Sequence, residues 1–399
     1  MNARTILTNI VSLVSYKMHK KRRNALIACV SSLMDGSAAS VTSIGRGIRG
    51  KVFEKHRIKR ADRLLSNANL TSEVSSIYAV LCQLFCSSKY PVISVDWSDL
   101  DDRKAHFLLR AAISVKGRSI TLYQEVHTNK TKEKATTHNA FLEILHTILP
   151  KDCRPVIVTD AGYKSPWFRQ IIVLNWFIVG RVRKPHHYSI NGGKQWQCIS
   201  HLYELASVRP KRFDSMQIAK YRPFDCTLVL IKQKSKGRHA KNSDGSVKKS
   251  KISLKHSEGA TDPWLLATNL PAHRTLSEQV VGIYRQRMQI EESFRDMKST
   301  RFGLGFEQNN TTKKSRLTIL VLLTTLASVI LILSGMALFM SGKVQRFKAN
   351  TETRHTLSFH TLGQRAWTAR TRFTLSQWQR TIKWLDELID NAWSGRVLT

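Results

Sequence analysis

The segment from Leu317 to Met340 contains no charged residue and is long enough to cross a lipid bilayer as a helix. It is apolar all round, so a helix here must be covered on every side, by lipid or by the rest of the protein. Cations flank both ends, so the positive-inside rule gives no orientation. Because the segment begins soon after a helix rich in charged residues, and because we expect no secretory signal, we predict a buried core helix. A membrane span is the alternative.

That charged helix is predicted from the stretch YRQRMQIEESFRDMK at 284–298. At 100° per residue, Tyr284, Arg287, Glu291 and Lys298 project from one narrow face, and Arg295 joins them. One continuous helix would therefore carry a carboxylate among cations. Such a face suits work on phosphate esters, in which the carboxylate holds a metal ion and the cations hold the substrate backbone. The apolar residues that we expect to face the core are Ile283, Ile290, Phe294 and Met297.

Two aspartates, Asp96 and Asp160, each follow directly on a short apolar run that predicts a buried strand. A carboxylate at a strand end lies on a rigid scaffold at the rim of a sheet, where a cleft can form. With Glu291 they make three carboxylates, which suffice for two divalent ions. Mg²⁺ takes few protein oxygens and leaves the other positions to water and phosphate, as phosphodiester hydrolysis and transfer require.

These motifs resemble the bacterial insertion-sequence transposases of the DDE type, which carry a Y-x2-R-x3-E-x6-K signature after the second aspartate. The signature is met at 284–298 without a gap. The segments VDWSDL at 95–100, TDAGYKSPW at 159–167 and PWLLATNLP at 263–271 look like the family's two aspartate strands and the strand before the signature helix. The resemblance covers about residues 20–345 and is closest to the cut-and-paste members that form DNA hairpins.

The resemblance implies a role for each matched residue. Asp96, Asp160 and Glu291 would be the catalytic residues and would bind two Mg²⁺ ions, for which Mn²⁺ can substitute. Tyr284, Arg287, Arg295 and Lys298 would grip phosphates near the scissile bond. Two further DNA contacts are implied, at Trp264, on which a flipped base would stack, and at Arg181, whose alignment needs a one-residue gap. A buried core tryptophan is the alternative for Trp264.

The charge of the chain favours a polyanionic partner. Lys+Arg 64 against Asp+Glu 28 gives a net charge of +36. Residues 1–87 are predicted to be helical and strongly basic, and SAASVTSIGRGI at 37–48 has the turn residues and following amphipathic pattern of a helix-turn-helix. The resemblance implies that this domain recognises the terminal inverted repeats of the transposon. A basic helical face that is merely solvated is the alternative.

Residues 88–184 predict, in order, three strands, a helix, a strand, a helix and a fifth strand, at 91–96, 105–115, 118–127, 136–149, 155–159, 165–174 and 176–183. This order suggests a mixed sheet flanked by helices, and so an α/β fold with the ribonuclease-H-like core that the resemblance implies. The catalytic core would comprise 88–184 and 272–345. Asp99, Asp101 and Asp102 are expected in a polar turn beyond the first strand, as capping or solvated residues.

The separation of Asp160 from Glu291 predicts an inserted subdomain at 185–271, which we expect to be β-rich. Its lysine-rich stretch 232–251 predicts a loop, either a solvated linker or a phosphate-binding segment. The last region, 346–399, predicts a helix from the spacing of Trp384, Leu385, Leu388 and Ile389. From its position it would support a homodimer on DNA, or simply pack on its own chain.

The sequence thus favours a metal-dependent transposase that acts on double-stranded DNA, both transposon ends and target, in the bacterial cytoplasm at the nucleoid and not in a membrane. Two alternatives stay open. A catalytically silent DNA-binding relative would keep the charge but need not keep three carboxylates, and all three are present. A membrane-associated basic protein would instead insert residues 317–340 into lipid.

Overall fold

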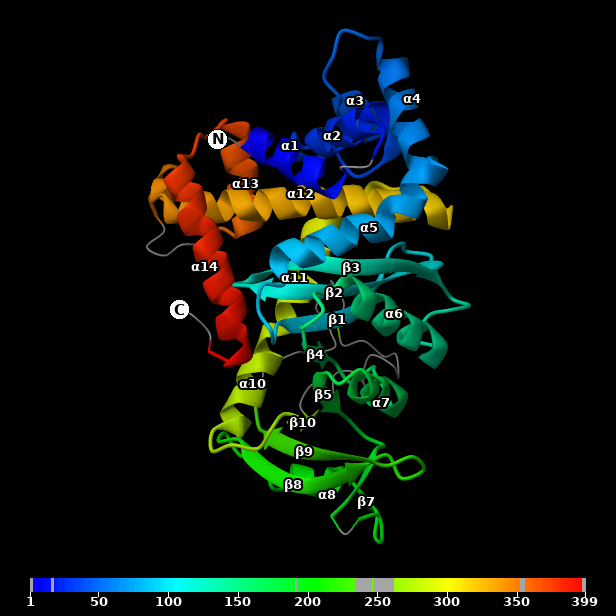
Figure 1. Cartoon of the computed structure of the whole chain (residues 1–399), viewed down its shortest axis with the longest axis vertical. Helices are drawn as coiled ribbons and strands as arrows, with labels where there is room; N and C mark the ends of the chain where they lie inside the picture. The colour runs from blue at the N-terminus through cyan, green and yellow to red at the C-terminus, as the bar shows by residue number, and fades with distance from the viewer. Residues whose placement is uncertain are drawn as a thin grey trace. The chain divides into compact units, whose positions relative to one another are not determined.

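The computed structural model describes residues 3–15, 18–190, 192–233, 246, 262–351 and 356–396. They form two compact units (Figure 1). The first unit draws on Met1–Pro155 and Gln286–Trp393, and the second on Val156–Arg285 and Ser394–Arg396. The second unit is therefore built mainly from one stretch of sequence that lies between the two parts of the first.

The first unit opens with helices, as the sequence predicts for residues 1–87. Asn67 caps the last of them, because its side chain accepts a hydrogen bond from the backbone N–H of Leu70 at 2.8 Å. Helices α3 and α4 cross closely at Gly45, where a Cβ would collide with the backbone of Ile58. The helices are α1 Ala3–Val14, α2 Lys20–Met34, α3 Val41–Gly47, α4 Glu54–Leu65 and α5 Ala68–Phe85.

Three antiparallel strands follow, in the order β3-β2-β1. The register places Asp96 on β1 opposite Arg110 on β2, and Arg110 opposite Gln124 on β3. Residues opposite one another in an antiparallel ladder point to the same face of the sheet, so these three side chains form one row. The bounds are β1 Val92–Asp99, β2 His106–Val115 and β3 Arg118–Thr128, followed by helix α6 Ala135–Ile148.

The polar turn after β1 begins later than the sequence predicts. Asp99 was expected in this turn, but it pairs with Phe107 and is the last residue of β1, because the ladder continues past the apolar run. Asp101 does cap the turn, since its carboxylate accepts hydrogen bonds from the backbone N–H groups of Ala105 and His106 at 3.0 and 2.9 Å.

The apolar segment forms helix α12, Lys314–Met340, and it is buried: 89% of its most hydrophobic window lies inside the protein. It packs against α1, α2, α5 and β3 and, most extensively, against α13. Gly335 and Gly363 permit that last contact, because a Cβ on either would collide with the backbone of Phe359 or Leu331 on the opposite helix. The predicted burial is confirmed. Among the described residues, α12 is also the one helix long and apolar enough to cross a membrane.

The C-terminal region is helical, as predicted. Trp384 stacks on Phe339 of α12 with ring centroids 5.5 Å apart, and Leu385 and Ile389 are buried. The helix of this region thus packs on its own chain, and its part in a homodimer stays a prediction. The elements that follow α11 are η1 Phe306–Gln308, α12, η2 Lys343–Phe347, α13 Phe359–Thr368 and α14 Leu375–Trp393.

The second unit contains a mixed sheet in the order β4-β5-β10-β9-β8-β6-β7. Strands β4 and β5 are parallel and joined by helix α7, whereas the other pairs are antiparallel. Except for Lys232, Gln233 and Ser246, the lysine-rich stretch lies outside the described residues. The elements are β4 Val156–Thr159, α7 Ser165–Val173, β5 Phe177–Val182, β6 His187–Ser189, β7 Gln197–Cys198, α8 Ser200–Tyr203, β8 Lys211–Ile218, β9 Phe224–Ile231, β10 Trp264–Thr268 and α10 Leu276–Gln286.

The prediction of one continuous helix over 284–298 is wrong. Helix α10 ends at Gln286, and α11 begins at Met288 and ends at Lys298. Arg287 between them keeps helical dihedral angles, φ −52° and ψ −36°. At this break the carbonyl oxygen of Gln286 accepts a hydrogen bond from Ser114 Oγ on β2 at 3.3 Å. A strand side chain thus bonds one of the backbone carbonyl groups that are left without a partner at the end of a helix.

Candidate active site

Arg287 joins two of the three predicted catalytic carboxylates within the first unit. Its Nη1 donates to Asp96 Oδ2 at 3.0 Å, and its Nη2 donates to Glu291 Oε1 at 2.7 Å. Arg287 and Asp96 are 191 residues apart in the sequence, and their side chains are only 11% and 14% exposed, whereas Glu291 is 42% exposed. The fold therefore brings a strand carboxylate and a helix carboxylate to opposite ends of one guanidinium group.

Asp96 is held rigidly. Its Oδ1 accepts a hydrogen bond from the backbone N–H of Trp97 at 2.8 Å, while Oδ2 faces Arg287. It lies inside β1, three residues before the end of the strand, so the ladder with β2 fixes its backbone. Such a carboxylate loses little freedom when it binds a cation.

Lys298, at the other end of α11, also reaches β1. Its Nζ donates to Ser98 Oγ at 2.7 Å. Ser98 and Asp96 are two residues apart on the strand and so point to the same face. Burial lowers the pKa of Lys298, partly against the pull of Asp99. Two of the predicted phosphate-binding cations, Arg287 and Lys298, thus lie along the face of β1 that carries Asp96.

Arg295 does not join this group. Its side chain is 61% exposed and pairs with Glu292 on the same helix. Its angle around the helix axis predicts a position beside Arg287, Glu291 and Lys298. That angle does not fix the direction of a long flexible side chain, so the prediction is wrong. The apolar face of α11 is as predicted, with Ile290, Phe294 and Met297 buried.

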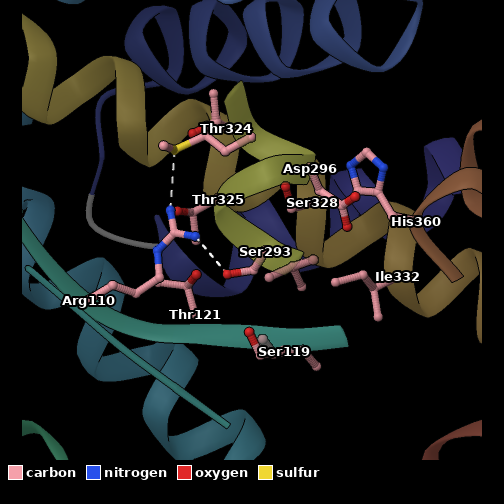
Figure 2. A pocket seen from close by; sticks show the side chains of 13 residues that line it. Arg110, Ser119, Thr121, Ser293, Asp296, Thr324, Thr325, Ser328, Ile332 and His360 are labelled. Atoms are coloured by element: carbon pink, nitrogen blue, oxygen red, sulfur yellow. Dashed lines mark hydrogen bonds between the residues drawn. The ribbon is translucent and has the colours of Figure 1, made fainter. Parts of the chain in front are cut away.

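Arg110 was missed by the sequence reasoning, although it is the most deeply buried cation near the site. It is 3% exposed, lies opposite Asp96 in the sheet and donates to Ser293 Oγ on α11 at 2.9 Å (Figure 2). Burial lowers its pKa to about 10. The available signal was an arginine within the otherwise apolar strand HFLLRAAISV, where a charge needs a specific reason.

Asp160 lies in the second unit, directly after β4 as predicted. Its Oδ1 accepts a hydrogen bond from the backbone N–H of Gly162 at 2.8 Å, which forms a tight turn at the carboxyl end of the strand. In the same turn region Tyr163 packs against Trp167 with ring centroids 4.7 Å apart, and both are buried. A packed strand-to-helix turn therefore presents this carboxylate.

The second unit also gathers three of the predicted DNA-binding residues. Trp264, half-buried at the start of β10, meets Tyr284 of α10 edge to face with ring centroids 4.8 Å apart. Arg181 lies on the neighbouring strand β5 and donates through Nη2 to the carbonyl oxygen of Asp262 at 3.1 Å. Burial lowers the pKa of Arg181, and the nearby Tyr284 hydroxyl opposes that shift. Tyr284 is only 4% exposed and packs on Trp264, so it does not share the charged face of Arg287, Glu291 and Lys298 on which the sequence places it.

The donor chemistry at Asp96 and Glu291 fits a hard divalent cation. Among the described residues no group of three His, Cys, Asp or Glu side chains is close enough to hold a metal ion. Asp96 and Glu291 nevertheless converge on one positive group, the Arg287 guanidinium. Mg²⁺ uses one or two carboxylates and completes its shell with water and substrate phosphate, so the pair suits it.

A basic cavity of about 960 Å³ opens among the N-terminal helices. Arg22 on its wall is held by Glu73 at 2.8 Å and by Asn67, whereas Lys59, Arg60 and Arg63 on α4 are exposed. None of the described residues that line the cavity is acidic. Its basic residues are His19, Lys21, Arg22, His56, Lys59, Arg60 and Arg63.

In the first unit a strand carboxylate, with the carboxylate and the cations that α11 adds beside it, has the donor groups that phosphodiester chemistry needs. The comparison with known families gives the protein family. Residues 87–330, more than half of the chain, match the family described as Transposase DDE domain, and the chain belongs to that family. Membership implies a transposase that cuts and joins DNA. No curated protein matches the chain.

Proposed function

We propose that this chain binds the terminal inverted repeats of an insertion sequence and moves it by a cut-and-paste route that depends on Mg²⁺. The observation that carries the proposal is the Asp96–Arg287–Glu291 bridge, because it joins two signature carboxylates through the signature arginine. Asp160, at the end of β4, is the third carboxylate of the proposed triad, and Mn²⁺ can replace Mg²⁺ in this proposal.

When bound, the two metal ions would activate a water molecule and stabilise the leaving 3′ oxygen. The chain itself supplies three proposed ligands and the cations that hold the DNA backbone. Arg287 and Lys298 are mostly buried and lie beside Asp96, so their charges act on a phosphate in a medium of lowered dielectric. Arg295 is the weaker phosphate contact in this proposal, because it is exposed and pairs with Glu292.

The reaction is proposed in four steps at one site. Water attacks the phosphorus at a transposon end, and the P–O3′ bond breaks to release a 3′-OH. This hydroxyl attacks a phosphorus of the opposite strand and displaces the 3′ oxygen of the flanking DNA, which closes a hairpin. Water then attacks the hairpin phosphorus and frees the 3′-OH again. The same 3′-OH finally attacks a phosphorus of the target DNA and displaces a 3′ oxygen of the target strand. The edge-to-face pair of Trp264 and Tyr284 supplies an aromatic platform on which an unstacked base could rest during hairpin formation, beside Arg181.

The basic cavity supports the proposed end-binding role of the N-terminal helices. Exposed cations on one helix attract the phosphates of a duplex, and counterion release makes such binding sensitive to salt. We further propose that the enzyme works as a homodimer on two DNA ends in the bacterial cytoplasm, at the nucleoid. The burial of α12 supports a location off the membrane.

The test is cleavage of a DNA fragment that carries the ends of the element. We expect wild-type protein to cut it only with Mg²⁺ or Mn²⁺, and the variants Asp96→Ala, Asp160→Ala and Glu291→Gln to bind the fragment without cutting it. Arg295→Gln is the matched control on α11 and should keep most of the activity. Binding without cleavage by the wild-type protein would favour the silent relative, and full cleavage by Glu291→Gln would contradict the proposed ligand role.

A further inference from the structure

Arg110 stands out because it is a cation buried without an acidic partner. It is 3% exposed, and no described ion pair includes it. Burying a charge without a counterion is unfavourable, so a position filled by arginine inside an apolar strand needs a compensating use. The groups around Arg110 indicate what that use is.

The Arg110 guanidinium is fully engaged with one helix and one neighbouring strand. Nη1 donates to Ser293 Oγ at 2.9 Å and Nη2 approaches Met297 Sδ at 3.2 Å, both on α11 (Figure 2). The Phe294 ring lies 4.6 Å from the guanidinium carbon, so it adds a cation–π contact from the same helix. Three residues of α11 therefore contact the one planar guanidinium group.

The third nitrogen is held from the sheet. Nε donates to Gln124 Oε1 on β3 at 2.9 Å. The amide nitrogen of Gln124 donates in turn to the Tyr78 hydroxyl and to Thr325 Oγ1, both at 2.7 Å. These contacts from α5 and α12 fix which end of the amide faces Arg110. The guanidinium is thus locked in orientation before anything binds.

The position of this anchor relates it to the site. Arg110 lies directly opposite Asp96 in the β1–β2 register, and Ser293 lies two residues after Glu291 on α11. The Arg110 side chain therefore connects the strand position opposite Asp96 to the residue two positions after Glu291 on α11. We propose that Arg110 is a positioning residue that sets the separation of Asp96 and Glu291 for metal binding.

This inference rests on the proposed function, and its test has a readout that an ordinary loss of stability would not give. Mn²⁺ binding to the DNA-free protein is followed by electron paramagnetic resonance, beside cleavage and end binding. Removing a nearby positive charge should by itself tighten Mn²⁺ binding, because the cation repels the ion. Displacing Glu291 should weaken it. Weaker Mn²⁺ binding in a variant without Arg110 therefore indicates that Arg110 positions Glu291, whereas tighter binding indicates only the loss of a repelling charge.

We expect Arg110→Gln to bind DNA ends within about twofold of wild type, to bind Mn²⁺ about tenfold more weakly and to cleave about 100-fold more slowly, since misplaced catalytic groups lose rate on this order. Arg110→Lys keeps the charge but not the planar fork, so it should recover only part of both losses. Arg118→Gln is the matched control. It removes another strand cation that holds α11, through Asp296 at 2.5 Å, and it should lower stability without changing Mn²⁺ affinity.

Unchanged or tighter Mn²⁺ binding in Arg110→Gln would overturn the positioning role, as would full recovery by Arg110→Lys. An equal loss of Mn²⁺ affinity in Arg118→Gln would overturn it too, because any loosening of α11 would then have the same effect. Glu291→Gln distinguishes this failure from that of the proposed function. If Glu291→Gln keeps Mn²⁺ binding and cleavage, the proposed ligand set is wrong, whatever Arg110 does.

Discussion

Replacing Arg287 by glutamine should destabilise the metal-free protein, because it leaves two carboxylates without the cation that they share. The pair with Asp96 is largely buried, with side chains 11% and 14% exposed, whereas Glu291 is 42% exposed. Breaking a fully buried pair costs about 3–5 kcal/mol, and an exposed pair is worth about 0–1 kcal/mol. Asp96 keeps its hydrogen bond from Trp97 N–H, which reduces the loss. We therefore expect a loss of about 2–3 kcal/mol in the free energy of unfolding.

The assay is thermal unfolding at neutral pH with a chelator present. At about 2–4 °C per kcal/mol for a unit of this size, Tm should fall by about 5–10 °C in Arg287→Gln. Arg287→Lys should lose about half as much, because one ammonium group cannot donate to both carboxylates in the same geometry. Arg295→Gln is the control on the same helix and should change Tm by less than about 2 °C, since its pair is exposed.

Divalent metal should reverse part of this loss. An ion held by Asp96 and Glu291 would replace the missing positive charge, so Mg²⁺ should raise Tm more in Arg287→Gln than in wild type. A Tm for Arg287→Gln within about 1 °C of wild type, under chelation, would refute the reasoning. Such a small change would mean that the bridge contributes almost nothing to the free energy of unfolding. An equal fall in Arg295→Gln would show instead that any charge removed from α11 has the same effect.

Three further predictions concern other parts of the chain. Burial lowers the pKa of His138 from 6.5 to about 4, and its ring accepts a hydrogen bond from Trp97 Nε1. The free energy of unfolding should therefore be constant above pH 6.5, because His138 is neutral there in both states. It should fall by about 1.4 kcal/mol per pH unit as the pH drops toward about 4, because only the unfolded chain then takes up the proton. In acid titrations His138→Gln should flatten that profile. Gly335→Ala should lower Tm by about 5 °C or more in calorimetry, because its Cβ would collide with the Phe359 backbone. Trp264→Ala should slow hairpin formation about tenfold on denaturing gels and spare the first strand cut, whereas Trp264→Phe should not.

Within 88–184 the sequence predicted every strand and helix in order. Short apolar runs such as the one before Asp160 gave the strands, because a strand buried on both faces needs continuous apolar residues. Helices were predicted from the wider apolar spacing, as in α6. These signals are local, so they survive without knowledge of the tertiary fold. The end of β1 at Asp99 was not predictable, because pairing with β2 decided it.

The signature helix shows where local reasoning stops. Its periodicity predicted the buried face of α11, but not the break at Arg287, where the sheet contributes a hydrogen bond from Ser114. Tyr284 matched the signature by spacing, yet its ring packs on Trp264, which is supplied by a strand earlier in the sequence. Both facts depend on contacts between distant segments, and no periodicity within one helix contains them.

The side chains at the site differ in exposure: the buried ones are held in place, and the exposed one is free to change its partner. Arg110 is buried and held by α11 and β3, Asp96 is held by the ladder and by Trp97 N–H, and Arg287 is slightly more buried than Asp96. Glu291, at the end of the series, is the exposed member. In the proposed site a cation arriving from solvent would therefore meet Glu291 first, and exchange of its bond to Arg287 would cost least there, because an exposed ion pair contributes little. The rigid carboxylate keeps the geometry, and the exposed one can release Arg287 and change partner.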